Sequence, residues 1–287
     1  MSAILEVRNL THIYSAGTPF EHKALDNVSF SVERGEFIGI IGHTGSGKST
    51  LMQHLNGLLK STSGEVLLDG VDIWKDKATT RQARFRVGLV FQYPEYQLFE
   101  ETVYKDIAFG PKNMGLKADE IDRRVREAAA LVGLTEAQLQ VSPFDLSGGQ
   151  KRRVAIAGVI AMEPEVLILD EPTAGLDPMS RAGILENIEA YRKAKNATIM
   201  MVSHSMNDVA RLTERLLVMN GSRLAMDDTP KNVFTRAQEL LDMGLDIPDV
   251  TRVFLRLQQM GLPVEPVYTM DQAVAAIKGL KEGNAHA

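Results

Sequence analysis

In the stretch GHTGSGKST, residues 42–50, three glycines are followed directly by a lysine and by two residues with hydroxyl side chains. Together these groups are suited to phosphate binding. The spacing in this stretch matches G-x-x-x-x-G-K-[ST], the P-loop pattern. Glycine backbone can turn its N–H groups inward around phosphate oxygens, helped by the positive end of the helix dipole. The predicted nucleotide-binding residues are Gly42, His43, Thr44, Gly45, Ser46, Gly47, Lys48, Ser49 and Thr50.

The three polar residues at the end of this stretch have separate expected roles. Lys48 neutralises the outer phosphates and so assists catalysis, while Ser49 supplies a hydroxyl to a Mg²⁺ that bridges two phosphates. Thr50 steadies the loop or a nearer phosphate. A chance glycine-rich turn is the competing interpretation. The apolar strand pattern before the loop and the helix pattern after it favour the P-loop.

Two carboxylates follow the apolar run VLIL as Asp170 and Glu171. At the tip of a buried strand, Asp170 is predicted to hold Mg²⁺, mostly through water. Glu171 is placed to polarise the attacking water as a general base, a role worth roughly 10²–10⁴ in rate. Two acidic residues after a strand, taken alone, are usually solvated charges in a loop. Because the same chain contains a P-loop, we interpret Asp170 and Glu171 as catalytic-site residues.

The string LSGGQKRR at 146–153 repeats the use of glycine at a predicted helix start, where backbone donors can meet a γ-phosphate. With the P-loop, it resembles the signature motif of the nucleotide-binding subunits of ABC transporters. The resemblance implies ATP and Mg²⁺ as cofactors and a head-to-tail dimer. In such a dimer the signature residues act on the ATP of a second ATPase subunit; here they are Ser147, Gly148, Gly149 and Gln150.

Four further residues stand in the order of that family's landmarks. Gln92 resembles the Q-loop residue, which touches Mg²⁺ or the lytic water, and Asp177 resembles the D-loop residue between subunits. His204 resembles the switch histidine on the γ-phosphate, although a histidine after an apolar strand is more often structural. Tyr14 resembles the aromatic residue that stacks on adenine, with a surface or core tyrosine as the alternative.

The segment 91–115, FQYPEYQLFEETVYKDIAFGPKNMG, resembles energy-coupling factor (ECF) transporter ATPases. These drive uptake of vitamins and metals through a membrane T component that holds substrate-specific S components. The resemblance implies that Tyr93 to Phe99 line a groove for the T component and that the chain lies peripherally on the cytoplasmic face of the membrane. Packing within the helical subdomain is the other interpretation. The segment 14–30 favours the second ATPase of a heterodimer, and a homodimeric cobalt or nickel importer ATPase stays open.

The patterns around these motifs predict an α/β fold with a P-loop NTPase core. Alternating apolar and polar residues at 4–14 and 25–42 predict antiparallel strands that lead into a fully buried strand. A helix is predicted at 48–59, with Leu51, Leu55 and Leu58 on one stripe. Two buried strands with a helix between them, from 166 to 204, predict a parallel βαβ unit.

We expect two domains. Residues 1–230 form the ABC ATPase domain, with a helical subdomain at about 93–160, and residues 231–287 form a small helical extension. In that extension, Val250, Val253, Phe254 and Leu257 share one apolar stripe. The stripe indicates a surface that helps ATPase subunits associate, or packing on the chain's own domain.

The composition of the chain argues against several other classes of function. The chain has 287 residues, a net charge of −5 and no cysteine, which argues against nucleic acid as the main partner and excludes disulfides and thiolate metal sites. Its longest apolar run, VAIAGVIAM at 154–162, is far below the ~18 residues of a membrane span. Membrane contact is therefore expected only through partners, and the N-terminus lacks a secretory signal.

Two functions of other classes compete with transport. A soluble ABC ATPase of DNA repair or translation uses the same site, but such relatives usually carry two cassettes, a long coiled coil or zinc cysteines. A sensor that binds ATP without turnover is disfavoured because Glu171 and His204 are both present. The residues contain no indication of the transported substrate, which the S components select in this family.

Overall fold

A computed structural model describes the backbone of residues 3–284 and the side chains of residues 3–279. The chain forms two compact units. The first contains the described residues up to Glu36 together with Ser49–Met201, and the second contains Phe37–Lys48 together with the described residues from Val202 onwards. Within the described part of the chain, no helix has the length and apolar character required to cross a bilayer.

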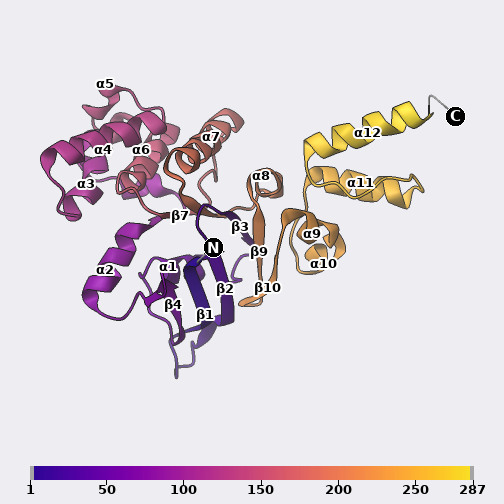
Figure 1. The fold of residues 1–287 in the computed structure, drawn as a ribbon, viewed down its shortest axis with the longest axis horizontal. Helices are drawn as coiled ribbons and strands as arrows, with labels where there is room; N and C mark the ends of the chain where they lie inside the picture. The colour runs from indigo at the N-terminus through magenta and orange to yellow at the C-terminus, as the bar shows by residue number, and fades with distance from the viewer. Residues whose placement is uncertain (1–2, 285–287) are drawn as a thin grey trace. The chain divides into compact units, whose positions relative to one another are not determined.

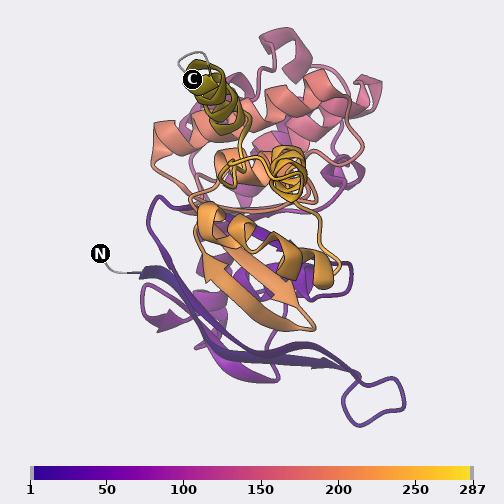
Figure 2. The same ribbon diagram turned by 90° about the vertical axis from the view of Figure 1, so that its right-hand side faces the viewer.

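An antiparallel sheet forms the N-terminal part of the first unit. Its strand order is β2-β1-β4-β5, and Val7 of β1 lies opposite both Phe30 and Val66. Figure 2 shows the long β1–β2 pair and the loop that joins the two strands at one end. The predicted antiparallel strands are confirmed as β1 (Ala3–Tyr14) and β2 (His22–Glu33), and β4 (Ser63–Leu68) and β5 (Val71–Asp72) complete the sheet.

Helices occupy most of the middle of the first unit, and Figure 1 shows α3 to α6 gathered together. Buried apolar residues such as Ile107, Val125 and Val154 hold them against one another. Thr102 caps α3 by accepting a hydrogen bond from the backbone N–H of Lys105. The elements are α2 (Lys77–Arg86), η1 (Pro94–Gln97), α3 (Val103–Asn113), α4 (Ala118–Leu131), α5 (Glu136–Leu139), η2 (Pro143–Asp145) and α6 (Gly148–Ile160).

Parallel strands complete the first unit. β6 (Val87–Val90) pairs in parallel with β7 (Val166–Asp170), and β8 (Thr198–Val202) lies on the other side of β7. Helix α7 (Pro178–Lys195) connects β7 to β8, which confirms the predicted βαβ unit. Every residue of β7 is buried. A strand that is covered on both faces needs apolar residues on both, which explains the continuous apolar run VLIL.

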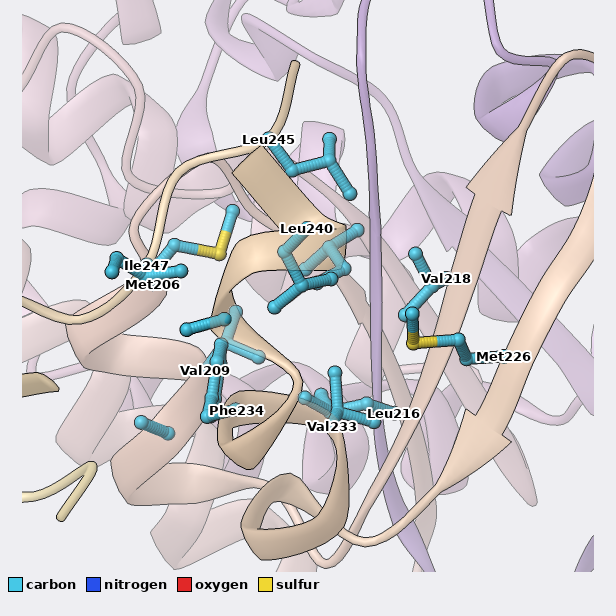
Figure 3. Close-up of a cluster of buried hydrophobic side chains, with 13 residues drawn as sticks. Met206, Val209, Leu216, Val218, Met226, Val233, Phe234, Leu240, Leu245 and Ile247 are labelled. Atoms are coloured by element: carbon cyan, nitrogen blue, oxygen red, sulfur yellow. The ribbon is translucent and has the colours of Figure 1, made fainter. Parts of the chain in front are cut away.

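The second unit has its own sheet and core. β3 (Phe37–Gly42) pairs in parallel with β9 (Arg215–Asn220), and β9 pairs antiparallel with β10 (Arg223–Asp228). Figure 3 shows the core where β9 and β10 meet the short helices, with Val218, Phe234 and Leu240 among its side chains. Those helices are α8 (Met206–Leu212), α9 (Pro230–Thr235) and α10 (Ala237–Asp242).

The last two helices, α11 (Asp249–Gln259) and α12 (Met270–Asn284), enclose a smaller cluster around Phe254. On the predicted apolar stripe of α11, Val250 and Phe254 are buried, whereas Val253 is 55% exposed. Thr251 is buried as well, and its hydroxyl donates a hydrogen bond of 2.7 Å to the carbonyl of Val267. That bond allows a polar residue to occupy the inner face.

The helix after the P-loop, α1 (Lys48–Leu55), is shorter than predicted. Gly57 has φ +71°, in the left-handed region that ends helices, and the N–H groups of Leu58 and Leu59 both donate to the carbonyl of Gln53. Leu58 therefore leaves the helical stripe and is 42% exposed. The prediction that placed it beside Leu51 and Leu55 is wrong.

Candidate nucleotide-binding and hydrolysis site

The P-loop begins at the last residue of the buried strand β3 and requires glycine there for a steric reason. A Cβ atom on Gly42 would lie 2.5 Å from the carbonyl oxygen of Met219 and 2.5 Å from Oγ of Ser46. Gly45 and Gly47 have φ values of +81° and +100°, which residues with a side chain rarely adopt. The glycine spacing therefore reflects both close packing and a backbone that turns its N–H groups inward.

Lys48 starts helix α1 with its side chain folded back over the loop. Its Nζ donates hydrogen bonds to the carbonyls of Gly42 at 2.6 Å and His43 at 2.9 Å. The Oγ of Ser46 is completely buried and finds no hydrogen-bond partner among residues 3–279. An orphaned hydroxyl and an ammonium group at a helix N-terminus are the groups that phosphate oxygens would satisfy.

Ser49 and Asp170 come together in the first unit, as the metal-site prediction requires. The Ser49 hydroxyl donates a hydrogen bond of 2.9 Å to Oδ2 of Asp170, the last residue of β7. Asp170 is 8% exposed. A hydroxyl and a carboxylate are oxygen donors of the kind that Mg²⁺ prefers, so the residues present fit that ion.

Glu171 follows Asp170 with an unusual backbone. Its φ is +52°, a value that few non-glycine residues adopt, and its carbonyl accepts a hydrogen bond of 3.1 Å from the N–H of Ala174. The side chain is half-buried. Strain of this kind persists where the surrounding structure enforces it, and it often marks an active site.

Tyr14 lies next to the P-loop helix. Its hydroxyl is 3.3 Å from Oγ1 of Thr50, and its ring is 39% exposed, which leaves a face for stacking on a base. The ring also meets His12 edge-on at 4.4 Å, and His12 meets His54 at 4.6 Å. His54 is fully buried, with Nδ1 2.7 Å from the carbonyl of Thr50.

Burial lowers the pKa of both His12 and His54, and for His54 the neighbouring His12 lowers it further. Nδ1 of His12 and Nε2 of His54 have no hydrogen-bond partner among the described side and main chains. This pair of rings behind Tyr14 was not predicted. The only signal in the sequence was the spacing of His54, which stands one helical turn after Thr50.

The signature residues form the start of α6. Ser147 accepts a hydrogen bond from the N–H of Gln150 at 3.4 Å, and the Gln150 side chain accepts one from the N–H of Ser147 at 2.9 Å. This capping box leaves Gly148 and Gly149 as side-chain-free backbone in the first turn. The positive end of the α6 dipole is thus presented at Ser147, as anion binding requires.

Asp177 stands beside the signature residues. Its carboxylate caps α7 by accepting hydrogen bonds of 3.0 Å from the N–H groups of Met179 and Ser180. Hydrogen bonds from Ser180 hold the pKa of Asp177 below its ordinary value. Ser147, Gly149, Gln150 and Asp177 line one hollow of about 460 Å³, so the structure brings the signature and D-loop positions together.

Gln92 and His204 have similar positions in their own segments. Gln92 is exposed two residues beyond β6, and His204 is exposed two residues beyond β8. In the first unit, the parallel pairing of β6 and β7 places the Gln92 segment and Asp170 at the same edge of the sheet. His204 follows β8 directly before the cap of α8 at Ser205.

An apolar groove of about 330 Å³ opens between the segment after Gln92 and helices α3 and α6. Its lining includes Pro94, Leu98, Phe99, Phe109, Val159 and Met162. Of the segment Tyr93 to Phe99 that was predicted to line a groove, Pro94, Gln97, Leu98 and Phe99 line this one, whereas Tyr93, Glu95 and Tyr96 do not. The Tyr93 ring instead lies 5.7 Å from the guanidinium carbon of Arg152.

A buried strand ending in a glycine loop, a lysine at the helix start and a serine–aspartate pair define a P-loop nucleotide hydrolase. The family model described as ABC transporter matches residues 25–174. The energy-coupling factor transporter ATP-binding protein EcfA2 of Clostridium tetani is 55% identical over 94% of this chain and 94% of its own length. The EcfA2 protein of Clostridium perfringens is 52% identical over 98% of this chain and 99% of its own length.

Solved structures of ATP-binding cassette proteins are also similar to this chain. CbiO1 from Clostridium perfringens, described as part of the ABC transporter complex CbiONQ, has a TM-score of 0.75 and 39% identity over 91% of this chain and 98% of its own. A dimeric ATP-binding cassette bound to ADP and phosphate has a TM-score of 0.71 and 28% identity over 79% of this chain and 98% of its own. The chain belongs to the ABC ATPases, in the family of energy-coupling factor transporter ATP-binding proteins. The predicted fold class and family are confirmed.

Proposed function

We propose that this chain binds and hydrolyses MgATP to power an ECF-type importer of vitamins or other micronutrients. The observation that carries the proposal is the 2.9 Å contact between Ser49 and Asp170, because it joins the P-loop helix to the acid pair where the metal-bound phosphates would lie. Ser49, Asp170 and Gln92 would hold Mg²⁺, which when bound supplies charge neutralisation for the β- and γ-phosphates.

The chain's own residues would divide the remaining work. The P-loop N–H groups and Lys48 bind the phosphates, and Tyr14 stacks on adenine. Glu171 takes a proton from the attacking water, and His204 hydrogen-bonds the γ-phosphate. Ser147 and its glycines act on the nucleotide of a second ATPase subunit, with Asp177 between the subunits. Preorganised charge of this kind usually dominates phosphoryl transfer.

The groove lined by Phe99 and Phe109 would receive the cytoplasmic helices of the membrane T component. Phe99 is 57% exposed, and its ring packs edge-on against Phe109 at 5.0 Å, so two aromatic side chains already stand at the opening. Aromatic residues are common anchors of protein interfaces. This docking would place the chain peripherally on the cytoplasmic face of the membrane, with S components reached through the complex.

We propose residues 231–287 as an extension that helps two ATPase subunits associate. In this extension Val253, Met260, Met270 and Val274 are all at least 44% exposed, so α11 and α12 keep apolar surface outside their small shared core. The partner that we propose is a related ATPase, as in the heterodimeric form that the segment 14–30 resembles. If truncation after residue 232 leaves association without ATP unchanged, the extension has no such role.

The experiment that tests the proposed function compares membrane association and ATP turnover. The Phe99→Asp variant should leave the membrane fraction of cells that express the complete transporter, while its basal ATPase rate stays near that of the wild type. Val71→Asp, at another exposed apolar position, on β5, is the matched control and should remain with the membrane. Membrane association that survives Phe99→Asp, or a wild-type chain without ATPase activity, would contradict the proposal.

A further inference from the structure

Arg152 is an arginine that the phosphate-site motifs do not account for. It lies in the second turn of α6, five residues after Ser147, and only 2% of it is exposed. A buried guanidinium is expensive unless every donor finds a partner. Its partners therefore show what this position requires.

Two of those partners belong to the segment after Gln92. Nε and Nη2 of Arg152 donate to the two carboxylate oxygens of Glu95 at 2.9 and 2.6 Å, a bidentate pair. Burial alone would raise the pKa of Glu95, but the hydrogen bonds and charge of Arg152 bring it below its ordinary value. The pair is thus ionised near neutral pH.

The third donor of the guanidinium reaches the segment after the acid pair. Nη1 donates to the carbonyl of Ala174 at 2.5 Å and, at 3.4 Å, to that of Pro172. Pro172 follows Glu171 directly, and the N–H of Ala174 donates to the Glu171 carbonyl. One side chain thus holds the backbone immediately after the residue with φ +52°.

We infer that Arg152 is a positioning residue for the general base Glu171: it holds residues 172–174 and so maintains the strained backbone that aims the carboxylate. The inference rests on the proposed function, since it deepens the role of Glu171 in hydrolysis. A conformation in a sparsely populated region persists only where neighbouring groups enforce it, and Arg152 supplies two such contacts. Glu95 in turn fixes the guanidinium.

The contacts of Arg152 lie close to two groups of residues with different proposed roles. Ser147 begins α6 and acts on the nucleotide of the second subunit, whereas Glu171 acts on the nucleotide of its own P-loop. Arg152 lies on the helix that Ser147 caps, so one element carries both the signature residues and the contacts to Pro172 and Ala174. Glu95 connects the same guanidinium to the segment that borders the apolar groove.

The test uses the full chain with the variants Arg152→Met, Glu95→Met and the double variant Arg152→Met/Glu95→Met. The single variants leave a buried charge unpaired and should melt earlier, while the double variant removes both charges and should recover most of the wild-type melting temperature. Arg124→Met is the matched control, because Arg124 is also largely buried and ion-paired, with Glu120 and Glu163, but contacts none of these segments.

We expect the double variant to keep wild-type ATP affinity and lose about 10- to 100-fold in kcat, since misplacing a base by about 1 Å can have that effect. Recovery of kcat together with the melting temperature would show that Arg152 only balances the charge of Glu95, and would overturn the inference. Amide hydrogen exchange at residues 173–176 should also accelerate in Arg152→Met and not in Arg124→Met. That readout is independent of hydrolysis, so unchanged exchange refutes the inference even if the proposed function fails.

Discussion

The hydroxyl of Ser49 and the carboxylate of Asp170 share a hydrogen bond of 2.9 Å, although the two residues are 121 positions apart in the sequence. Ser49 stands in the first turn of α1, and Asp170 ends the fully buried strand β7. Both side chains offer oxygen atoms of the kind that Mg²⁺ prefers. If the proposed metal site is right, the metal dependence of hydrolysis should change when either side chain is replaced.

Replacing Asp170 by Asn tests the metal site. The amide keeps an acceptor for the Ser49 hydroxyl but removes the negative charge that Mg²⁺ requires. We expect the Mg²⁺ concentration for half-maximal ATPase activity to rise by about tenfold or more, measured at saturating ATP. Asp119→Asn, on the exposed first turn of α4, is the control, and equal metal dependence in both variants would exclude Asp170 from the site.

The Glu171→Gln variant separates binding from hydrolysis. An amide cannot accept the proton of the attacking water, so the rate should fall by about 10²-fold or more while ATP affinity stays near that of the wild type. Lys48→Ala should do the reverse and lose nucleotide affinity first, because Lys48 neutralises the phosphates. Turnover by Glu171→Gln at the wild-type rate would assign the base to another residue.

The Gly42→Ala variant tests the packing of the P-loop. The added methyl would meet the backbone oxygen of Met219 at 2.5 Å, so the loop or β9 must move and nucleotide binding should be lost. Gly70→Ala is the matched control. At Gly70, φ is +75° but nothing lies within 4 Å of the added Cβ, so only a backbone penalty of about 1 kcal/mol is expected. Nucleotide titration of both variants makes the comparison.

Stability should decrease in acid because of His54. Burial lowers its pKa, so below the ordinary value of about 6.5 the unfolded chain binds a proton that the folded chain resists. The free energy of unfolding is therefore unaffected by this group above about pH 6.5 and falls below it, by at most ~1.4 kcal/mol per pH unit for one proton. Urea unfolding between pH 7.5 and 5.5 measures the slope.

In the His54→Gln variant the side chain cannot take up a proton in this pH range, so the slope should be flatter than in the wild type. The amide can still donate a hydrogen bond to the carbonyl of Thr50. His22→Gln, at an exposed position on β2, should leave the slope as it is in the wild type. His12 has a pKa lowered by burial as well, so it should contribute to the acid sensitivity that remains. An unchanged slope in His54→Gln would show that the buried ring does not govern it.

The phosphate-site motifs were predictable because each is a run of consecutive residues with local geometry. Gly42 to Thr50 need only a strand before them and a helix after them, and Ser147 to Gln150 need only a helix start. The alternation in β1 and β2 and the continuous apolar run of β7 likewise predicted their strands from the period of burial. Helix ends were less predictable, since Gly57 ends α1 before Leu58.

Other contacts join residues that no local pattern relates, and these become visible only in the folded chain. The pairing of Arg152 with Glu95 spans 57 positions, and both residues would pass in the sequence for ordinary surface charges. The edge-on contacts of His12 with His54 and with Tyr14 are of the same kind. Sequence patterns report the faces that each element buries, whereas the partner of a buried polar group depends on which elements the fold brings together.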